Sequence, residues 1–285
     1  MATLREIRRK LHSIENIEKI TQAMEMVAAS RLRRAQAKAD ISRLYSLKLK
    51  GILDQLIATS DDFMHPLIKE RKVKKTGFIV IAADRGLCGA YNYNVFSTTE
   101  KLLKNYSLTQ VELILVGRKT VDYFSNKQWK IGTKISEWGG KIKYSQINDL
   151  TQKLINQYLS HELDEIWLIY THYINISSRK VTIEKLLNID QSNFTKEVIL
   201  SNYIVEPTIP EILAEILPRY CATKVQSALN DSYASELAAR IFSMRSATKN
   251  AEEMIEHLTL TRNKIRQTNI TKELIEIASC VEILK

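Results

Sequence analysis

Two long stretches free of helix-breaking residues form the ends of this chain. Residues 1–50 and 219–285 contain neither glycine nor proline, and all eight glycines lie between Gly51 and Gly140. At about 1.5 Å rise per residue, helices of these lengths reach roughly 75 and 100 Å, whereas a compact middle of ~160 residues has a radius of gyration near ~15 Å. Helical arms of this length must project beyond the middle. A projecting helix buries its apolar stripe most simply against the other arm.

The apolar residues of both arms recur with helical spacing. Thr3 followed by Glu6 is a capping-box pattern that places the start of the first helix. The stripe of the first arm comprises Leu4, Ile7, Leu11, Ile14, Ile17, Met24, Val27, Leu32, Ala35 and Ala39. Steps of four and three in the second arm give a heptad seam through Leu237, Ile241, Met244, Thr248, Ala251, Ile255, Leu258, Arg262 and Ile265, resumed at Leu274, Ala278, Val281 and Leu284. The pattern predicts an antiparallel coiled coil of residues 1–58 and 211–285, with packing on the middle or on a second copy as alternatives.

The middle of the chain, residues 74–205, has the pattern of an α/β domain. Short apolar runs rich in β-branched residues predict strands over 77–83, 111–116 and 165–171, and residues 178–204 predict one or two more. Helical stretches over about 92–104, 118–127 and 147–160 lie between them. Strands that alternate with helices indicate a Rossmann-like domain with a mainly parallel sheet. Pro207, Pro210 and Pro218 separate this domain from the second arm.

Composition excludes several classes of protein. A hydrophobic content of 45% and a charged content of 26% are ordinary for a folded chain, and no apolar run approaches the ~20 residues that cross a bilayer. The N-terminal residues resemble neither a signal peptide nor a transit peptide. Cys88, Cys221 and Cys280 are odd in number and widely separated, so we expect free thiols in a reducing compartment. These features fit a bacterial cytoplasmic chain best.

The net charge of +10 is unevenly distributed: residues 1–40 hold nine Lys and Arg against five Asp and Glu, whereas residues 211–285 are balanced at ten against ten. Arg31, Arg33, Arg34 and Lys38 form a basic cluster on the first arm, for which a solvated helix face is the simplest interpretation. Nucleic acid, anionic lipid and an acidic protein all suit a basic surface. Residues 1–44 contain no aromatic side chain, which argues against a platform for stacking bases but leaves phosphate contacts open.

The segment Asp84-Arg85-Gly86-Leu87-Cys88-Gly89 follows a predicted strand and precedes a predicted helix, where doubly wound folds bind phosphates. It matches neither G-x-G-x-x-G nor the P-loop pattern, so a structural turn or a loop that contacts a partner is the better interpretation. No histidine is placed to serve Cys88 as a base, and the five histidines lack metal-ligand spacing. We therefore expect no catalytic residue, no metal and no cofactor.

Several ordered motifs resemble the gamma subunit of the F-type ATP synthase. Residues 17–36, IEKITQAMEMVAASRLRRAQ, are similar to the first helix of that family, and Asp84–Gly89 with Asn92 resembles its central motif. Four further segments resemble its last helix in order and spacing: Glu236–Met244, Ala247–Ala251, Asn263–Gln267 and Ile270–Glu273. The resemblance covers the whole chain, including the order of arm, domain and arm.

The resemblance implies a non-catalytic central rotor stalk, peripheral to the cytoplasmic side of a bacterial membrane. Its coiled coil would turn inside a hexamer of three alpha and three beta subunits, while its α/β domain would stand on the c-ring beside epsilon. Residues matched to positions that meet alpha and beta are Met24, Arg31, Arg33, Arg34, Arg266, Gln267, Thr271 and Glu273. Glu206 falls in the segment expected to meet the c-ring and epsilon. No nucleic acid is expected as a partner.

The sequence departs from the family pattern at two places. Cys280-Val281 stands where the family usually has Gly-Ala, which puts the fit at the tip of the last helix in question. Arg262 occupies an apolar seam position where the family commonly has Tyr, and we expect it to pair with a carboxylate or to extend outward. Two alternatives stay open at this point: a coiled-coil nucleic-acid-binding or structural protein, and a dinucleotide-dependent enzyme.

Overall fold

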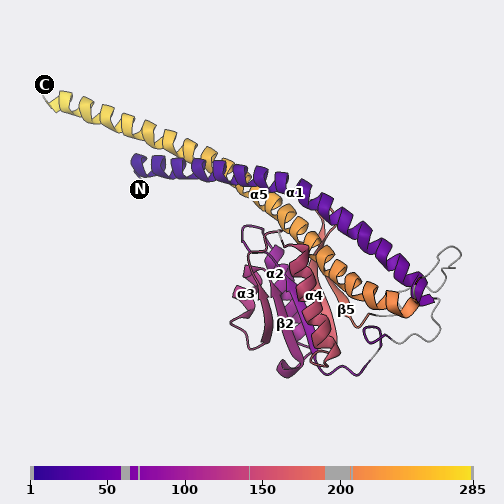
Figure 1. Cartoon of the computed structure of the whole chain (residues 1–285). Helices are drawn as coiled ribbons and strands as arrows, with labels where there is room; N and C mark the ends of the chain where they lie inside the picture. The colour runs from indigo at the N-terminus through magenta and orange to yellow at the C-terminus, as the bar shows by residue number, and fades with distance from the viewer. Residues whose placement is uncertain are drawn as a thin grey trace. The chain divides into compact units, whose positions relative to one another are not determined.

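A computed structural model describes residues 3–58, 65–69, 71–140, 142–189, 206 and 208–283, without the side chains of Ala58 and of residues from Cys280 onward. The chain forms two compact units, which we describe separately (Figure 1). The first contains Met1–Ala28 and Ile241–Lys285, which we call the shaft, and the second, Ala29–Arg240, we call the central unit. The domain boundaries expected at residues 74 and 205 stay a prediction.

The two arms are helices, as the absence of breakers predicts. Helix α1 spans Leu4–Ala58 and helix α5 spans Ile209–Ile283. Both extend past the nearest breakers, because Gly51 lies within α1 and Pro210 and Pro218 lie within α5. Pro210 occupies the first turn, where the missing N–H has no cost. Leu217, beside Pro218, is fully buried, and this packing offsets the hydrogen bond that Pro218 removes.

A five-stranded sheet forms the middle of the central unit, with strand order β3-β2-β1-β4-β5. Its strands are β1 (Thr76–Ile81), β2 (Val111–Val116), β3 (Lys130–Ile135), β4 (Glu165–Tyr173) and β5 (Arg179–Leu187). The first four are parallel, and β5 pairs with β4 in the antiparallel sense. The predicted α/β class with a mainly parallel sheet is confirmed. Strand β3, an edge strand with half its side chains exposed, was not predicted, because it lacks an apolar run.

Helices cover both faces of this sheet. The connecting helices are α2 (Tyr91–Leu103), α3 (Arg118–Phe124) and α4 (Tyr144–Leu159), with a short 3-10 helix η1 (Leu108–Gln110) before β2. Alternate residues of β1 point to opposite faces: Phe78 and Val80 pack with α2 and α3, whereas Ile79 and Ile81 pack with α4, α1 and α5. The central-unit parts of α1 and α5 therefore complete the second core (Figure 1).

In the shaft, α1 and α5 form one apolar seam. On α5 the heptad positions are all buried or half-buried, which confirms the pattern there: Ile241, Met244, Thr248, Ala251, Ile255, Leu258, Arg262 and Ile265. On α1 the corresponding heptad is also buried or half-buried: Leu4, Ile7, Leu11, Ile14, Glu18, Thr21, Glu25 and Ala28. Met24 and Glu15, outside that heptad, are half-buried as well. The predicted stripe through Ile17 and Val27 was wrong, since these side chains are 49% and 52% exposed. A strict heptad continued from Leu4 passes through Glu18 and Thr21 instead, so register outweighs the apolar character of single residues.

Among the described residues, no helix combines the length and apolar character that crossing a membrane requires. The same part of the chain holds no group of three or more His, Cys, Asp or Glu side chains arranged to hold a metal ion.

Candidate functional site: the shaft and the seat of helix α5

Two polar contacts show how the helices of the shaft are paired. The hydroxyl groups of Thr21 and Thr248 lie 2.8 Å apart on the seam, and Glu25 accepts two hydrogen bonds from the guanidinium of Arg245, at 2.8 and 2.9 Å. Numbering rises along α1 as it falls along α5, so the pair is antiparallel. Both threonine hydroxyl groups also bond to a carbonyl one turn earlier in their own helix, which satisfies polar atoms in an otherwise apolar seam.

Helix α5 continues beyond the end of its partner. Counting equal numbers of residues from the Thr21–Thr248 pair brings Leu4, the first residue of α1, level with Ile265. From Arg266 to Ser279 every side chain is exposed, including Leu274, which was expected to resume the seam. We call Arg266–Ser279 the free end. Its large apolar side chains are 50–62% exposed: Ile270, Leu274, Ile275 and Ile277.

The free end exposes an apolar stripe. Ile270, Leu274 and Ile277 have the spacing i, i+4 and i+7, which places them on one face of the helix. In globular proteins a helix gains most of its stability by packing such a face. Exposed apolar surface of this kind marks a site for another macromolecule. The paired part of the shaft also carries exposed apolar residues. Ile17 and Val27 were expected on the seam, whereas five others have no place in the predicted stripe: Ile20, Met26, Phe242, Met254 and Leu260. Their signal in the sequence is an apolar residue outside the heptad seam.

The four predicted contact residues of α5 all lie on the free end. Arg266, Gln267, Thr271 and Glu273 are exposed, and Thr271 donates a hydrogen bond to the carbonyl of Gln267 at 2.9 Å. The side chains of Arg266, Gln267 and Glu273 form no hydrogen bond or ion pair within the described part of the chain. The structure thus gathers them, within two helical turns, beside the exposed apolar residues Ile270 and Leu274.

The other predicted contact residues are more scattered. Met24 is half-buried on the shaft, whereas Arg31, Arg33 and Arg34 are exposed on the part of α1 that belongs to the central unit. Glu206 is exposed, and its two neighbours lie outside the described residues. The question raised by Cys280-Val281 also falls on side chains that the structure does not describe.

Arg262 lies on the seam and is half-buried. Within the described residues no carboxylate pairs with it, so the structure does not support the first of the two expectations. Its partial exposure fits the second, in which the aliphatic stem packs along the seam and the guanidinium reaches water.

The loop after β1 is joined to neighbouring loops by one carboxylate. The carboxylate of Asp84 accepts hydrogen bonds from the backbone N–H groups of Arg118, Glu137 and Gly139, at 2.8–2.9 Å. These donors belong to the start of α3 and to the loop after β3. The Asp84 carboxylate therefore ties the loop after β1 to the two neighbouring loops at the same edge of the sheet. This geometry fits the interpretation of residues 84–89 as a structural turn.

The rest of this loop rests against α5. Arg240 donates to the carbonyl oxygen of Gly86 at 3.2 Å and pairs with Glu236 at 2.7 Å. Cys88 is buried, and burial raises the pKa of its thiol, so Cys88 stays protonated and is no candidate nucleophile. Burial also raises the pKa of Glu236, and the nearby Arg240 opposes this shift only in part.

Polar groups hold α5 across the carboxyl ends of the strands. Ser232 accepts a hydrogen bond from the N–H of Thr171 on β4, and Ser235 donates to the carbonyl of the same residue, at 3.3 and 3.0 Å. Asp231, almost fully buried, accepts from Arg43 of α1 at 3.0 Å and from His172 of β4 at 2.6 Å. We call Glu211–Arg240 of α5 the seated stretch. It covers the carboxyl edge of β4, beside β1, the region in which doubly wound sheets bind ligands.

Residues 3–284 match the ATP synthase family, ATP-synt. The chain is similar to the ATP synthase gamma chain of Protochlamydia amoebophila (strain UWE25), with 52% identity over 285 residues and complete coverage of both chains. It is 39% identical to the ATP synthase gamma chain of Moorella thermoacetica, again with complete coverage of both.

Among solved structures, the chain resembles one in the central stalk and c-ring of the Tetrahymena thermophila mitochondrial ATP synthase, with a TM-score of 0.61 and 25% identity over 80% of this chain and 99% of that one. It also has the fold of a chain in the Euglena gracilis mitochondrial ATP synthase, with a TM-score of 0.69 and 17% identity over 99% and 94% of the two chains.

Proposed function

The chain belongs to the ATP synthase gamma family, and from that premise we propose that it is the rotating central stalk of an F-type ATP synthase. It is a non-catalytic subunit whose turning couples ion flow through a c-ring to ATP synthesis or hydrolysis on beta subunits. Its partners are three alpha subunits, three beta subunits, epsilon and the c-ring. It is peripheral to a membrane complex, on the cytoplasmic side of a bacterial membrane.

The free end is the observation that carries this proposal. A helix that projects past its partner and exposes Ile270, Leu274, Ile275 and Ile277 needs an enclosing apolar surface. A ring of alpha and beta subunits would supply such a sleeve around the helix. The polar groups of Arg266, Gln267 and the neighbouring Glu273 would then meet loops of that ring by directed hydrogen bonds.

The shape of the shaft accounts for the coupling. It consists of two helices up to Ile265 and of one helix beyond, so it has no threefold symmetry. Three chemically identical catalytic sites differ only if something contacts them differently, and an axle biases each site by its differential interaction with the states of that site. An asymmetric axle that turns therefore moves each site through its states in sequence.

We assign the remaining predicted contacts by the same resemblance. Met24 and the basic side chains of Arg31, Arg33 and Arg34 lie near an acidic segment of beta, and the exposure of these arginines leaves their charges available. Glu206 belongs to the region that meets the c-ring and epsilon.

Isolation of the native complex tests the assembly. Chromosomally tagged chain should co-purify with alpha and beta in a stoichiometry of three to three to one. Recovery of the native chain without these subunits would contradict the proposal. Strongly salt-dependent binding of the purified chain to DNA, with no such subunits, would favour the coiled-coil nucleic-acid-binding alternative.

A charge reversal on the free end tests the site. Arg266→Glu should lower the ratio of ATP-driven proton pumping to ATP hydrolysis in membrane vesicles, because a loop of the ring would lose a charge-assisted contact. Lys249→Glu, on a side chain 75% exposed in the paired part of the shaft, is the control for the change of charge. Equal effects of the two variants would refute the assignment of Arg266.

A further inference from the structure

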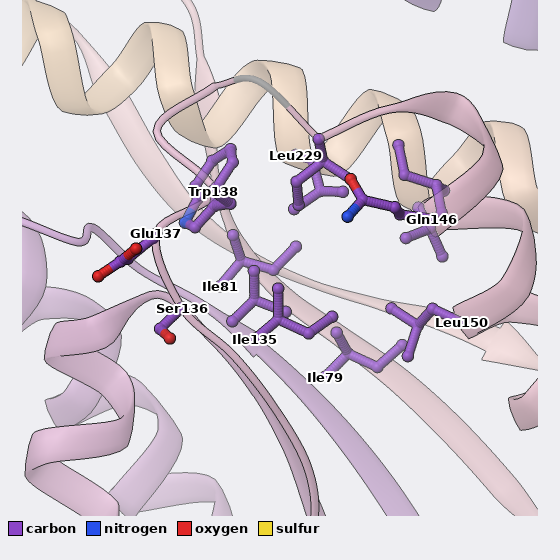
Figure 2. Close-up of a pocket in the computed structure, with 13 residues that line it drawn as sticks. Ile79, Ile81, Ile135, Ser136, Glu137, Trp138, Gln146, Leu150 and Leu229 are labelled. Carbon is purple, nitrogen blue, oxygen red and sulfur yellow. The ribbon is translucent and has the colours of Figure 1, made fainter.

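A cavity of about 240 Å³ lies in the central unit, between the sheet and helices α4 and α5 (Figure 2). Aliphatic side chains from β1 and β3, among them Ile79, Ile81 and Ile135, form its floor, and Leu150 and Leu229 close it from the two helices. An apolar cavity of ~150 Å³ in another protein stays free of water and takes up benzene. The space here is larger, and most of its lining is apolar, with Ser136, Glu137 and Gln146 as the polar members.

One hydrogen-bond donor points into this space. The side-chain oxygen of Gln146 accepts from the N–H of Lys143 at 3.1 Å, which leaves its amide nitrogen without a partner among the described residues. Figure 2 shows this nitrogen directed toward the middle of the cavity, whereas the carboxylate of Glu137 points away from it. The cavity thus offers an apolar interior with the amide of the exposed Gln146 at its edge, and an apolar pocket with a few polar groups is the usual composition of a small-molecule site.

The loop that forms the mouth has an unusual backbone. Glu137, Gly139 and Gly140 have φ values of 62°, 43° and 72°, in the left-handed region that a residue such as Glu137 seldom adopts. The Asp84 carboxylate holds the N–H groups of Glu137 and Gly139, and a Cβ on Gly140 would collide with the ring of Tyr233. Strained backbone that its surroundings hold in place is found preferentially at ligand sites.

The buried Trp138 stands between these residues and forms a rigid wall. Its indole N–H donates to the carbonyl oxygen of Ala82 at 3.3 Å, and its ring packs edge to face against Tyr233. Since the wall, the floor and the mouth are all held by contacts within the central unit, the cavity is formed before any ligand enters.

We propose that this cavity binds a small uncharged molecule that carries an apolar ring or short chain and one hydrogen-bond acceptor. The apolar part fills the space over Ile79 and Ile81, and the acceptor takes the hydrogen bond that the amide of Gln146 can donate. An ion would lose its hydration among aliphatic side chains, and the exposed Glu137 carboxylate at the rim repels anions. The site is separate from the surfaces assigned to partner subunits and does not depend on that assignment.

Trp138 supplies a direct signal for the test. The chain has three tryptophans, so ¹⁵N-labelled full-length protein gives three indole N–H signals, and Trp138→Phe identifies the one at the cavity. Titration with cyclohexanone, a neutral ring with one acceptor, should shift the Trp138 signal saturably and leave those of Trp129 and Trp167 in place. Methylcyclohexane, which lacks the acceptor, should bind more weakly.

Matched variants locate the binding. Leu229→Phe places a larger side chain in the cavity. Because less space is left for the ligand, it should weaken cyclohexanone binding about tenfold or more. Gln146→Glu keeps the acceptor for Lys143 but removes the donor, and should weaken binding about threefold to tenfold. Gln146 is exposed, so this variant folds even if Leu229→Phe does not.

Gln152→Glu makes the same change at another exposed position of α4 and should bind as the unchanged protein does. Shifts that do not saturate, equal shifts of all three indole signals, or unchanged affinity in Gln146→Glu would overturn the proposal.

Discussion

The seated stretch and the free end of helix α5 contain similar side chains in opposite surroundings. In the seated stretch, Leu213, Leu217 and Leu229 are at most 3% exposed, whereas on the free end Leu274 and Ile277 are more than 60% exposed. Neither stretch contains glycine, and both are helical. The difference is that the sheet and α1 cover the first stretch, whereas none of the described residues covers the second. One helix is therefore part of a core along one stretch and exposed along another.

The largest expected effect comes from truncating one leucine in each stretch. Leu217→Ala removes a fully buried side chain and should lower the free energy of unfolding by about 2–5 kcal/mol. Leu274→Ala, on the free end, should change it by less than about 0.5 kcal/mol. Urea unfolding of the purified chain measures both values. Similar losses in the two variants would mean that the free end packs against its own chain in solution.

Substitutions of Asp84 test how much its loop, which contacts the seated stretch through Gly86, contributes to the stability of the central unit. Asp84→Ala removes the acceptor of three backbone N–H groups and should cost about 2 kcal/mol of unfolding free energy, since these groups can in part turn to water. Asp84→Asn keeps one acceptor oxygen and should cost about half as much. If phosphate restored the stability of the alanine variant, an anion would be able to replace the carboxylate. If neither substitution changed the free energy of unfolding, the Asp84 hydrogen bonds would not stabilise the central unit.

Glu236 gives the seated stretch a dependence on pH. Because burial raises its pKa, the folded chain holds the proton more tightly than the unfolded chain does. Its contribution to stability is therefore complete below the ordinary glutamate pKa of 4.5 and is lost as pH rises through the folded value. Unfolding free energies measured from pH 4 to 8 should show the unchanged protein losing stability relative to Glu236→Gln. Glu252→Gln, at an exposed position, is the control. If the unchanged protein gained unfolding free energy relative to Glu236→Gln as the pH rose, the raised pKa of Glu236 would be contradicted.

The smallest expected effect lies between the two stretches, in the paired part of the shaft. The ion pair of Glu25 and Arg245 has short distances, but the Arg245 side chain is 70% exposed. A double-mutant cycle with alanine at both positions should give a coupling energy of at most about 0.5 kcal/mol, and less at high salt. A coupling above 1 kcal/mol would show that this pair, and not the apolar seam, sets the register of the helices.

Much of the architecture could be predicted from local pattern. The arms follow from the absence of glycine and proline, the seam of α5 from heptad spacing, and the parallel sheet from alternating strands and helices. Predictions failed where one local signal competed with another. Ile17 and Val27 are apolar but lie outside the heptad that Glu18 and Thr21 continue, and the half-exposed β3 has no apolar run to reveal it.

Two long helices and an α/β middle follow from local sequence, because helix propensity and apolar spacing are properties of neighbouring residues. The sequence also carried the ordered motifs of the gamma family. The connection that Asp84 makes between three loops depends on tertiary structure, because its three donors come from segments 34 to 55 residues away. Tertiary structure likewise decided which part of α5 is covered, because burial depends on where α1 begins and on which surfaces fold back upon the helix.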